Sequence, residues 1–228
     1  KMINAPSLAN CNIFTIGEEI DEMIKGGVHL VHVDISDGHY VPNILFPLSI
    51  VKHIKERYPE LMVDVHLMVT NPEEYVDRMK QDGADYLSFH IDSTRFSRRL
   101  IEKIHNAGMK AGIILNPSQP ICLLEPLVRF ADYVVLMTVE PGFAGQKFMH
   151  DAIGRLEELQ ALKERTGTNF LISIDGGIDM EHSRECMKRG AEILISGIYT
   201  VFHQPDGLEK ACARYQEEME SIQKKAGF

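Results

Sequence analysis

The sequence predicts a single-domain (β/α)₈ barrel of the TIM type, spanning residues 1–228. Short apolar runs alternate with helical patterns along the chain, which is typical of a parallel sheet wrapped by helices. Eight strand–helix units can be placed, at about 28 residues each, and this matches the repeat of the barrel. Helix-ending glycines recur at near multiples of that repeat, at Gly27, Gly83, Gly108 and Gly190. An open doubly wound sheet would have fewer strands.

The expected strands are short runs rich in Val, Ile and Leu. In chain order they cover residues 3–8, 28–38, 61–68, 84–90, 110–115, 132–138, 170–175 and 191–197. The expected helices lie between and after them, at residues 14–25, 48–58, 71–82, 95–107, 121–130, 150–165, 180–189 and 207–225. Gly26 and Gly27 end the first helix. The third begins at Asn71-Pro72-Glu73, with an N-cap residue, a proline at the first helical position and an acid in the first turn.

The composition is typical of a cytoplasmic enzyme. Hydrophobic residues make up 44% of the chain, enough for a large core. The net charge of -9 argues against binding to nucleic acid or to an anionic membrane, which requires a basic excess. No apolar run approaches the roughly 20 residues that span a bilayer, and the amino terminus has no secretory-signal pattern. The four cysteines form no CxxC pair, so we expect free thiols.

Three of the expected strands carry polar residues on the face opposite to their apolar row. These residues are His32 and Asp34 in the second strand, Asp64 and His66 in the third, and Ser173 and Asp175 in the seventh. Met68 lies on the same face as Asp64 and His66. Burial of an imidazole or a carboxylate is unfavourable unless the group is paired. Pairing with each other and pairing through a metal ion are both compatible with the residues alone.

Barrel geometry favours the metal ion. Active sites of this fold lie at the carboxyl ends of the strands, and the interior is narrow enough for side chains from several strands to meet. His32, Asp34, His66 and Asp175 are ligand types that suit a divalent ion such as Zn²⁺, Mn²⁺, Fe²⁺ or Co²⁺. We therefore expect one such ion, with Asp34 and Asp175 on opposite sides of whatever binds above it. His90 also ends a strand, but a core role explains it equally well.

Glycine-rich loops follow the sixth, seventh and eighth strands, at residues 141–146, Gly176-Gly177 and Gly197. Glycines let backbone N–H groups approach an anion closely, and the late loops of many barrels hold phosphate. Tight turns are the alternative explanation. Lys147 is the only basic residue at these loops, but three such loops on one rim favour a bound phosphate.

Five segments resemble, in order and spacing, the ribulose-phosphate 3-epimerase family. They are residues 5–8 (APSL), 32–43 (HVDISDGHYVPN), 66–69 (HLMV), 137–146 (MTVEPGFAGQ) and 175–177 (DGG). The resemblance implies a ribulose-phosphate-binding type of barrel, a homo-oligomer, a sugar-phosphate substrate, and a divalent ion held by His32, Asp34, His66 and Asp175. It also implies substrate contacts from Ser7, His66, Met68, Met137, Gly142, Phe143, Ala144, Gly145, Gly176, Gly177, Gly197 and Ile198.

The reaction that the resemblance implies is inversion at C3 of a ketose phosphate, D-ribulose 5-phosphate to D-xylulose 5-phosphate, in the pentose phosphate pathway. Removal of the C3 proton beside the ketone gives an enediolate, whose charge a metal ion would stabilise as a Lewis acid. Inversion needs one acid/base group on each face of C3. We expect Asp34 and Asp175 to be these groups.

Departures from the family pattern put the sugar in question. Ser36 stands where Met is usual, Ala144 where Gly is more usual, and Ile198 where Ser is common. The FAGQ segment and Asn116-Pro117 are similar to the branch that converts D-allulose 6-phosphate to D-fructose 6-phosphate. Two more distant alternatives are a decarboxylase of the same barrel group, which typically has a Lys near the second and third strand ends, and a non-catalytic sugar-phosphate sensor.

Overall fold

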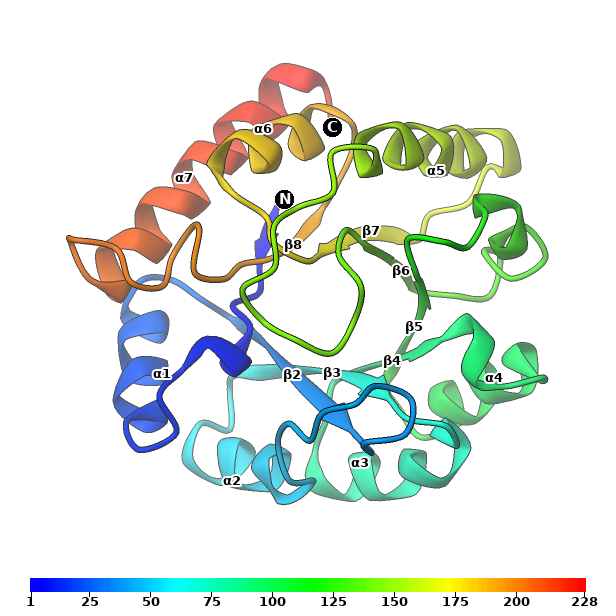
Figure 1. Ribbon diagram of the computed structural model, residues 1–228, viewed down its shortest axis with the longest axis horizontal. Helices are drawn as coiled ribbons and strands as arrows, with labels where there is room; N and C mark the ends of the chain where they lie inside the picture. The colour runs from blue at the N-terminus through cyan, green and yellow to red at the C-terminus, as the bar shows by residue number, and fades with distance from the viewer.

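The structure is a computed structural model that describes residues 1–228, and it forms a barrel of eight parallel strands surrounded by helices (Figure 1). The sheet order is β1-β8-β7-β6-β5-β4-β3-β2, so strands adjacent in sequence are adjacent in space. The barrel closes where Ser7 pairs with His32 and the His32 backbone N–H donates to the Pro6 carbonyl. The predicted fold class is confirmed.

The strands are β1 Ile3–Asn4, β2 Leu30–Ser36, β3 Met62–Met68, β4 Tyr86–His90, β5 Lys110–Leu115, β6 Tyr133–Met137, β7 Leu171–Asp175 and β8 Ile193–Ile195. The α-helices are α1 Ile16–Lys25, α2 Ser49–Arg57, α3 Val76–Asp82, α4 Ser97–Asn106, α5 Ala152–Thr166, α6 Met180–Lys188 and α7 Leu208–Ala226. Short 3₁₀ helices lie at Leu8–Asn10, Pro72–Tyr75, Ile91–Ser93 and Ile121–Leu124. None of the helices is both long and apolar enough to cross a bilayer.

Residues 121–130 do not form the α-helix that the sequence predicted. Only the 3₁₀ helix Ile121–Leu124 is present, and turns follow it. Pro126 explains the difference, because it has no N–H to donate and its ring would clash with the carbonyl four residues earlier in an α-helix. The segment still covers the barrel, since Ile121, Leu124 and Val128 are buried in the main core.

The alternation of side chains along the strands separates an outer core from the barrel interior. Val31, Val33 and Ile35 of β2 join the core of 53 buried residues, which includes side chains of both strands and helices. Leu30 points the other way, into a small interior cluster. The same interior face of β2 continues with His32 and Asp34, so the polar site lies toward the carboxyl end of the barrel.

The loop between β6 and α5 lies across the centre of the ring of strands in Figure 1. Side chains from two other loops hold it. The Asn43 amide donates to the Gly142 carbonyl at 2.9 Å, and the Tyr199 hydroxyl donates to the Gly145 carbonyl at 2.8 Å. The glycine-rich loop after β6 is therefore anchored beside the barrel mouth.

Candidate metal centre and substrate pocket

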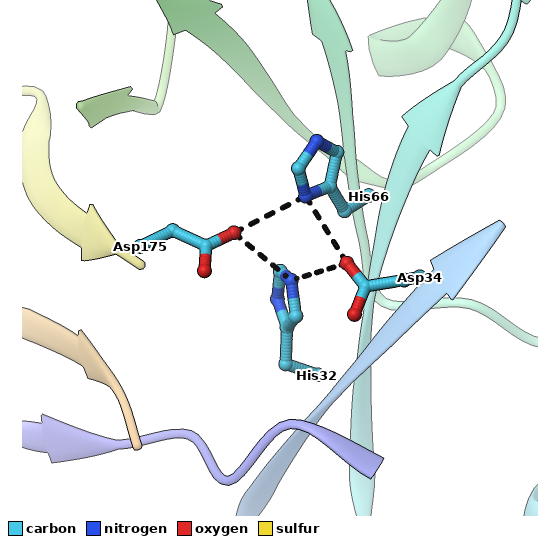
Figure 2. A group of neighbouring side chains, drawn as sticks. All are labelled: His32, Asp34, His66 and Asp175. Carbon is cyan, nitrogen blue, oxygen red and sulfur yellow. Dashed lines mark hydrogen bonds and ion pairs between the residues drawn. The ribbon is translucent and has the colours of Figure 1, made fainter. Parts of the chain in front are cut away.

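Four side chains from three strands meet at the carboxyl end of the barrel (Figure 2). His32 and Asp34 come from β2, His66 from β3, and Asp175 from the last position of β7. One possible ligand atom of each residue lies within 4.8 Å of those of the other three. The side chains are no more than 15% exposed, so water shields their charges poorly. The residues predicted to hold a metal ion are thus adjacent in space.

The spacing of these atoms fits a divalent ion. His32 Nε2 lies 3.1 Å from Asp34 Oδ1 and 3.4 Å from Asp175 Oδ2, and His66 Nδ1 lies 3.2 Å from each of the same two oxygens. Ligands that each lie about 2.0–2.2 Å from one ion are separated from their neighbours by about 3 Å. His66 Nδ1 is buried and makes no hydrogen bond, as expected of a lone pair reserved for a cation.

Charges within the cluster oppose the effect of burial. Burial raises the pKa of both carboxyl groups, but the neighbouring His32 and His66 outweigh it, so the pKa of Asp175 falls to about 2 and that of Asp34 also falls well below its usual value. Burial lowers the pKa of the His32 and His66 imidazoles, but the neighbouring carboxylates have the larger effect, so both pKa values are raised. Metal ligation requires neutral imidazoles, so a divalent ion would replace any proton that the ligating nitrogens carry.

Each histidine has a buried partner behind it. His32 Nδ1 lies 2.8 Å from Asp64 Oδ2, and His66 Nε2 lies 2.8 Å from His90 Nε2. Partners of this kind determine which ring nitrogen faces a metal ion. The sequence places Asp64 on the polar face of its strand, but it did not predict Asp64 as the partner of His32. It left open whether His90 lies in the core or at the rim. The alternation of side chains along the strand is the signal that could have identified Asp64.

A pocket joins the metal cluster to the glycine-rich loops. It is lined by Asp34, Asp175 and every residue that was predicted to contact the substrate, namely Ser7, His66, Met68, Met137, Gly142, Phe143, Ala144, Gly145, Gly176, Gly177, Gly197 and Ile198. No Lys or Arg lines it. The pocket therefore offers polar and backbone groups to a ligand, together with apolar and methionine side chains.

Comparison with known proteins identifies the family. The model of the ribulose-phosphate 3 epimerase family matches residues 3–202. The chain belongs to this family. Similar family members are the ribulose-phosphate 3-epimerases of Aquifex aeolicus, 39% identical over 193 residues (85% of this chain, 86% of the relative), and of Bacillus subtilis, 37% identical over 203 residues (89% and 93%). The chain is thus an epimerase-type isomerase, as the motifs indicated.

Solved structures share the fold of this family member at low sequence identity. The 3-hexulose-6-phosphate synthase of Salmonella typhimurium superimposes with a TM-score of 0.71 at 17% identity, covering 99% of this chain and all of that one. A mutant tryptophan synthase alpha-subunit of Pyrococcus furiosus gives a TM-score of 0.68 at 13% identity, with coverage of 96% and 97%. At such identities the likeness concerns the barrel alone.

In this epimerase-family chain, close approach of backbone segments shapes the glycine-rich end of the pocket. Gly177 has φ +60°, and a Cβ placed on it would lie 2.2 Å from the Gln146 carbonyl oxygen. Gly176 has φ +131°, and a Cβ there would lie 2.5 Å from Val139. Only glycine permits both the backbone conformation and the contact. Lys147, the only basic residue at the glycine-rich loops, does not line the pocket.

Ser36, one of the departures from the family pattern, has a clear structural role. Its hydroxyl donates to the Asn43 carbonyl and accepts from the Leu45 N–H, both at 2.9 Å. Ser36 itself does not line the pocket, whereas Leu45 does. The serine therefore fastens the loop after β2 and helps to hold an apolar side chain at the pocket wall.

Proposed function

We propose that this protein interconverts D-ribulose 5-phosphate and D-xylulose 5-phosphate by inverting the configuration at C3. The placement of Asp34 and Asp175 carries the proposal. Figure 2 shows the two carboxylates reaching the histidine pair from opposite sides, one from β2 and one from β7, each with one oxygen toward the histidines and the other turned away. Two acid/base groups on opposite faces are what inversion at a carbon atom requires.

Each carboxylate has one oxygen turned away from the histidines, and this oxygen can accept or donate the proton. Asp34 Oδ2 accepts a hydrogen bond from the Ser7 hydroxyl at 3.1 Å, which holds the carboxylate in place. Asp34 accepts the C3 proton on one face, and Asp175, carrying a proton, delivers it to the other face through Oδ1; the reverse reaction exchanges these roles. A divalent ion held by His32, Asp34, His66 and Asp175 would stabilise the negative charge that develops when the proton leaves.

The choice of sugar is supported by the relatives, and the choice of reaction by the pocket. The similar curated proteins bear the name ribulose-phosphate 3-epimerase, which favours ribulose 5-phosphate over allulose 6-phosphate. The absence of Lys from the pocket lining disfavours the decarboxylase alternative. We expect kcat/KM for ribulose 5-phosphate to exceed that for allulose 6-phosphate at least tenfold, and the reverse order would overturn the assignment of the sugar.

Isotope incorporation tests the chemistry. Xylulose 5-phosphate formed in D₂O should carry deuterium at C3, because the proton returned to carbon comes from a carboxyl group that exchanges with water. Product that retains the original hydrogen in a single turnover would contradict proton transfer through exchangeable side chains. Protein treated with a chelator provides the matched control without a metal ion.

We further propose that residues 1–228 act as one catalytic domain, in the cytoplasm, within the pentose phosphate pathway. We propose Zn²⁺, Mn²⁺, Fe²⁺ or Co²⁺ as the ion, because imidazole and carboxylate ligands suit these metals. A homo-oligomer is proposed from the family resemblance, and the net charge of -9 supports the absence of nucleic-acid and membrane partners. Metal analysis of the purified protein and light scattering after gel filtration test the ion and the assembly.

A further inference from the structure

A chain of buried hydrogen bonds leads from the barrel interior to one of the histidines of the candidate metal centre. The Tyr133 hydroxyl donates to Asp64 Oδ1 at 2.8 Å, and the other oxygen of Asp64 lies 2.8 Å from His32 Nδ1. Tyr133 and His32 are each 1% exposed and Asp64 is 2% exposed, so water cannot replace either contact. Both oxygens of the carboxylate are therefore engaged by protein donors.

The tyrosine ring occupies a place made for it by a glycine on the neighbouring strand. Gly112 of β5 is the registered partner of Tyr133 on β6. A Cβ atom on Gly112 would lie 2.3–2.7 Å from three atoms of the tyrosine ring, far inside van der Waals contact. Tyr86 also packs edge-to-face on the same ring, with centroids 5.6 Å apart. The ring thus packs against both Gly112 and Tyr86, and its hydroxyl is directed at Asp64.

We propose that Tyr133 is a positioning residue for the metal centre, which holds Asp64 so that His32 presents Nε2 to the ion. The inference rests on the proposed metal site. Asp64 accepts a hydrogen bond from the Nδ1–H of His32, which leaves the Nε2 lone pair free toward Asp34 and Asp175. Without the Tyr133 hydroxyl, one oxygen of a buried carboxylate loses its donor, and the carboxylate can rotate away from His32.

The test compares Tyr133→Phe with Tyr86→Phe as a matched control. Tyr86 is the registered neighbour of Asp64 on β4, and it packs on Tyr133, but its hydroxyl makes no hydrogen bond to Asp64. Co²⁺ affinity, measured by competition with a chromophoric chelator, should fall about tenfold in Tyr133→Phe, at the lower end of the range for loss of an outer partner. It should change less than twofold in Tyr86→Phe. Equal affinity in the wild type and Tyr133→Phe would overturn the inference.

A double-mutant cycle with Asp64→Asn tests the route of the effect. If Tyr133 acts through Asp64, Tyr133→Phe should weaken Co²⁺ binding much less in the Asp64→Asn background than in the wild type. Equal effects in both backgrounds would show a merely structural contribution and overturn the inference. The visible absorption spectrum of bound Co²⁺ should also shift in Tyr133→Phe and not in Tyr86→Phe. Failure of the wild type itself to bind Co²⁺ would instead refute the proposed metal site, and the positioning role with it.

Discussion

The Nε2 atoms of His66 and His90 lie 2.8 Å apart, so one imidazole must donate a hydrogen bond to the other. Burial and the nearby His66 hold the pKa of His90 well below its usual value, so His90 stays neutral and can accept. When the Nε2–H of His66 is the donor, the lone pair of His66 Nδ1 faces Asp34 and Asp175, 3.2 Å from each. His90 therefore determines which nitrogen of His66 is available to a metal ion.

Replacing His90 by Phe keeps a ring in the core but removes the acceptor for His66. We expect affinity for Zn²⁺ to fall about 10- to 100-fold, because His66 loses the partner that fixes its tautomer. Chelator competition measures the dissociation constant. His29→Phe, the same change at an exposed position, is the control. Unaltered affinity in His90→Phe would mean that His90 is only a packing residue.

Replacing Asp175 by Asn should lower epimerisation by about 10²- to 10⁴-fold even when the metal ion is saturating, because one face of C3 loses its acid/base group. Asp34 remains, so one of the two epimers should still exchange its C3 proton with D₂O without being converted. Asp34→Asn should exchange only the other epimer. NMR follows the loss of the C3 signal. Exchange of the same epimer by both variants would contradict the assignment of one carboxylate to each face.

A metal ion should stabilise the fold, because it binds the assembled cluster and not the unfolded chain. At 100 times its dissociation constant, the ion should raise the free energy of unfolding by about 2.7 kcal/mol. This corresponds to a rise in Tm of about 5–10 °C for a chain of this size. Differential scanning calorimetry of chelator-treated protein, with and without Zn²⁺, measures the rise. His66→Ala should show a smaller rise, and no rise in the wild type would count against the site.

Asp37 should make stability depend on pH at the acidic end. Burial opposes its ionisation, but the backbone N–H groups of Thr70, Tyr40 and His39 donate to its carboxylate and outweigh burial, so its pKa falls to about 2. Because the folded pKa is lowered, the stabilisation is complete above the unfolded pKa of about 3.9 and is lost as the pH falls toward 2.

Asp37→Asn isolates this contribution from those of other carboxyl groups. The variant should be less stable than the wild type by about 1 kcal/mol at pH 5, a value that allows for solvent screening at this partly exposed site. The gap should close as the pH falls from about 4 to about 2. Urea unfolding at pH 5 and at pH 3 measures both free energies. A gap of the same size at both values would rule out the ionised carboxylate as the cause.

Residue patterns along the chain were sufficient to predict the barrel and the meeting of His32, Asp34, His66 and Asp175. Both predictions follow from rules that hold for every member of the fold. Side chains alternate between the two faces of a strand, and the carboxyl ends of parallel strands lie on one rim. The expected helix at residues 121–130 does not form for a local reason, because Pro126 has no N–H to donate and its ring would clash with the preceding turn of an α-helix.

The partners of the central residues depend on the folded chain. Gly112 lies 21 positions before Tyr133, and Tyr133 lies 69 positions after Asp64, so their contacts exist only because strand register places them together. The hydrogen bonds of Ser36 likewise depend on the path of the loop that contains Asn43 and Leu45. The contact of His66 with His90 depends on the packing of their rings across neighbouring strands. Periodicity along one strand predicts which face a side chain occupies, but pairing between strands decides which atoms it meets.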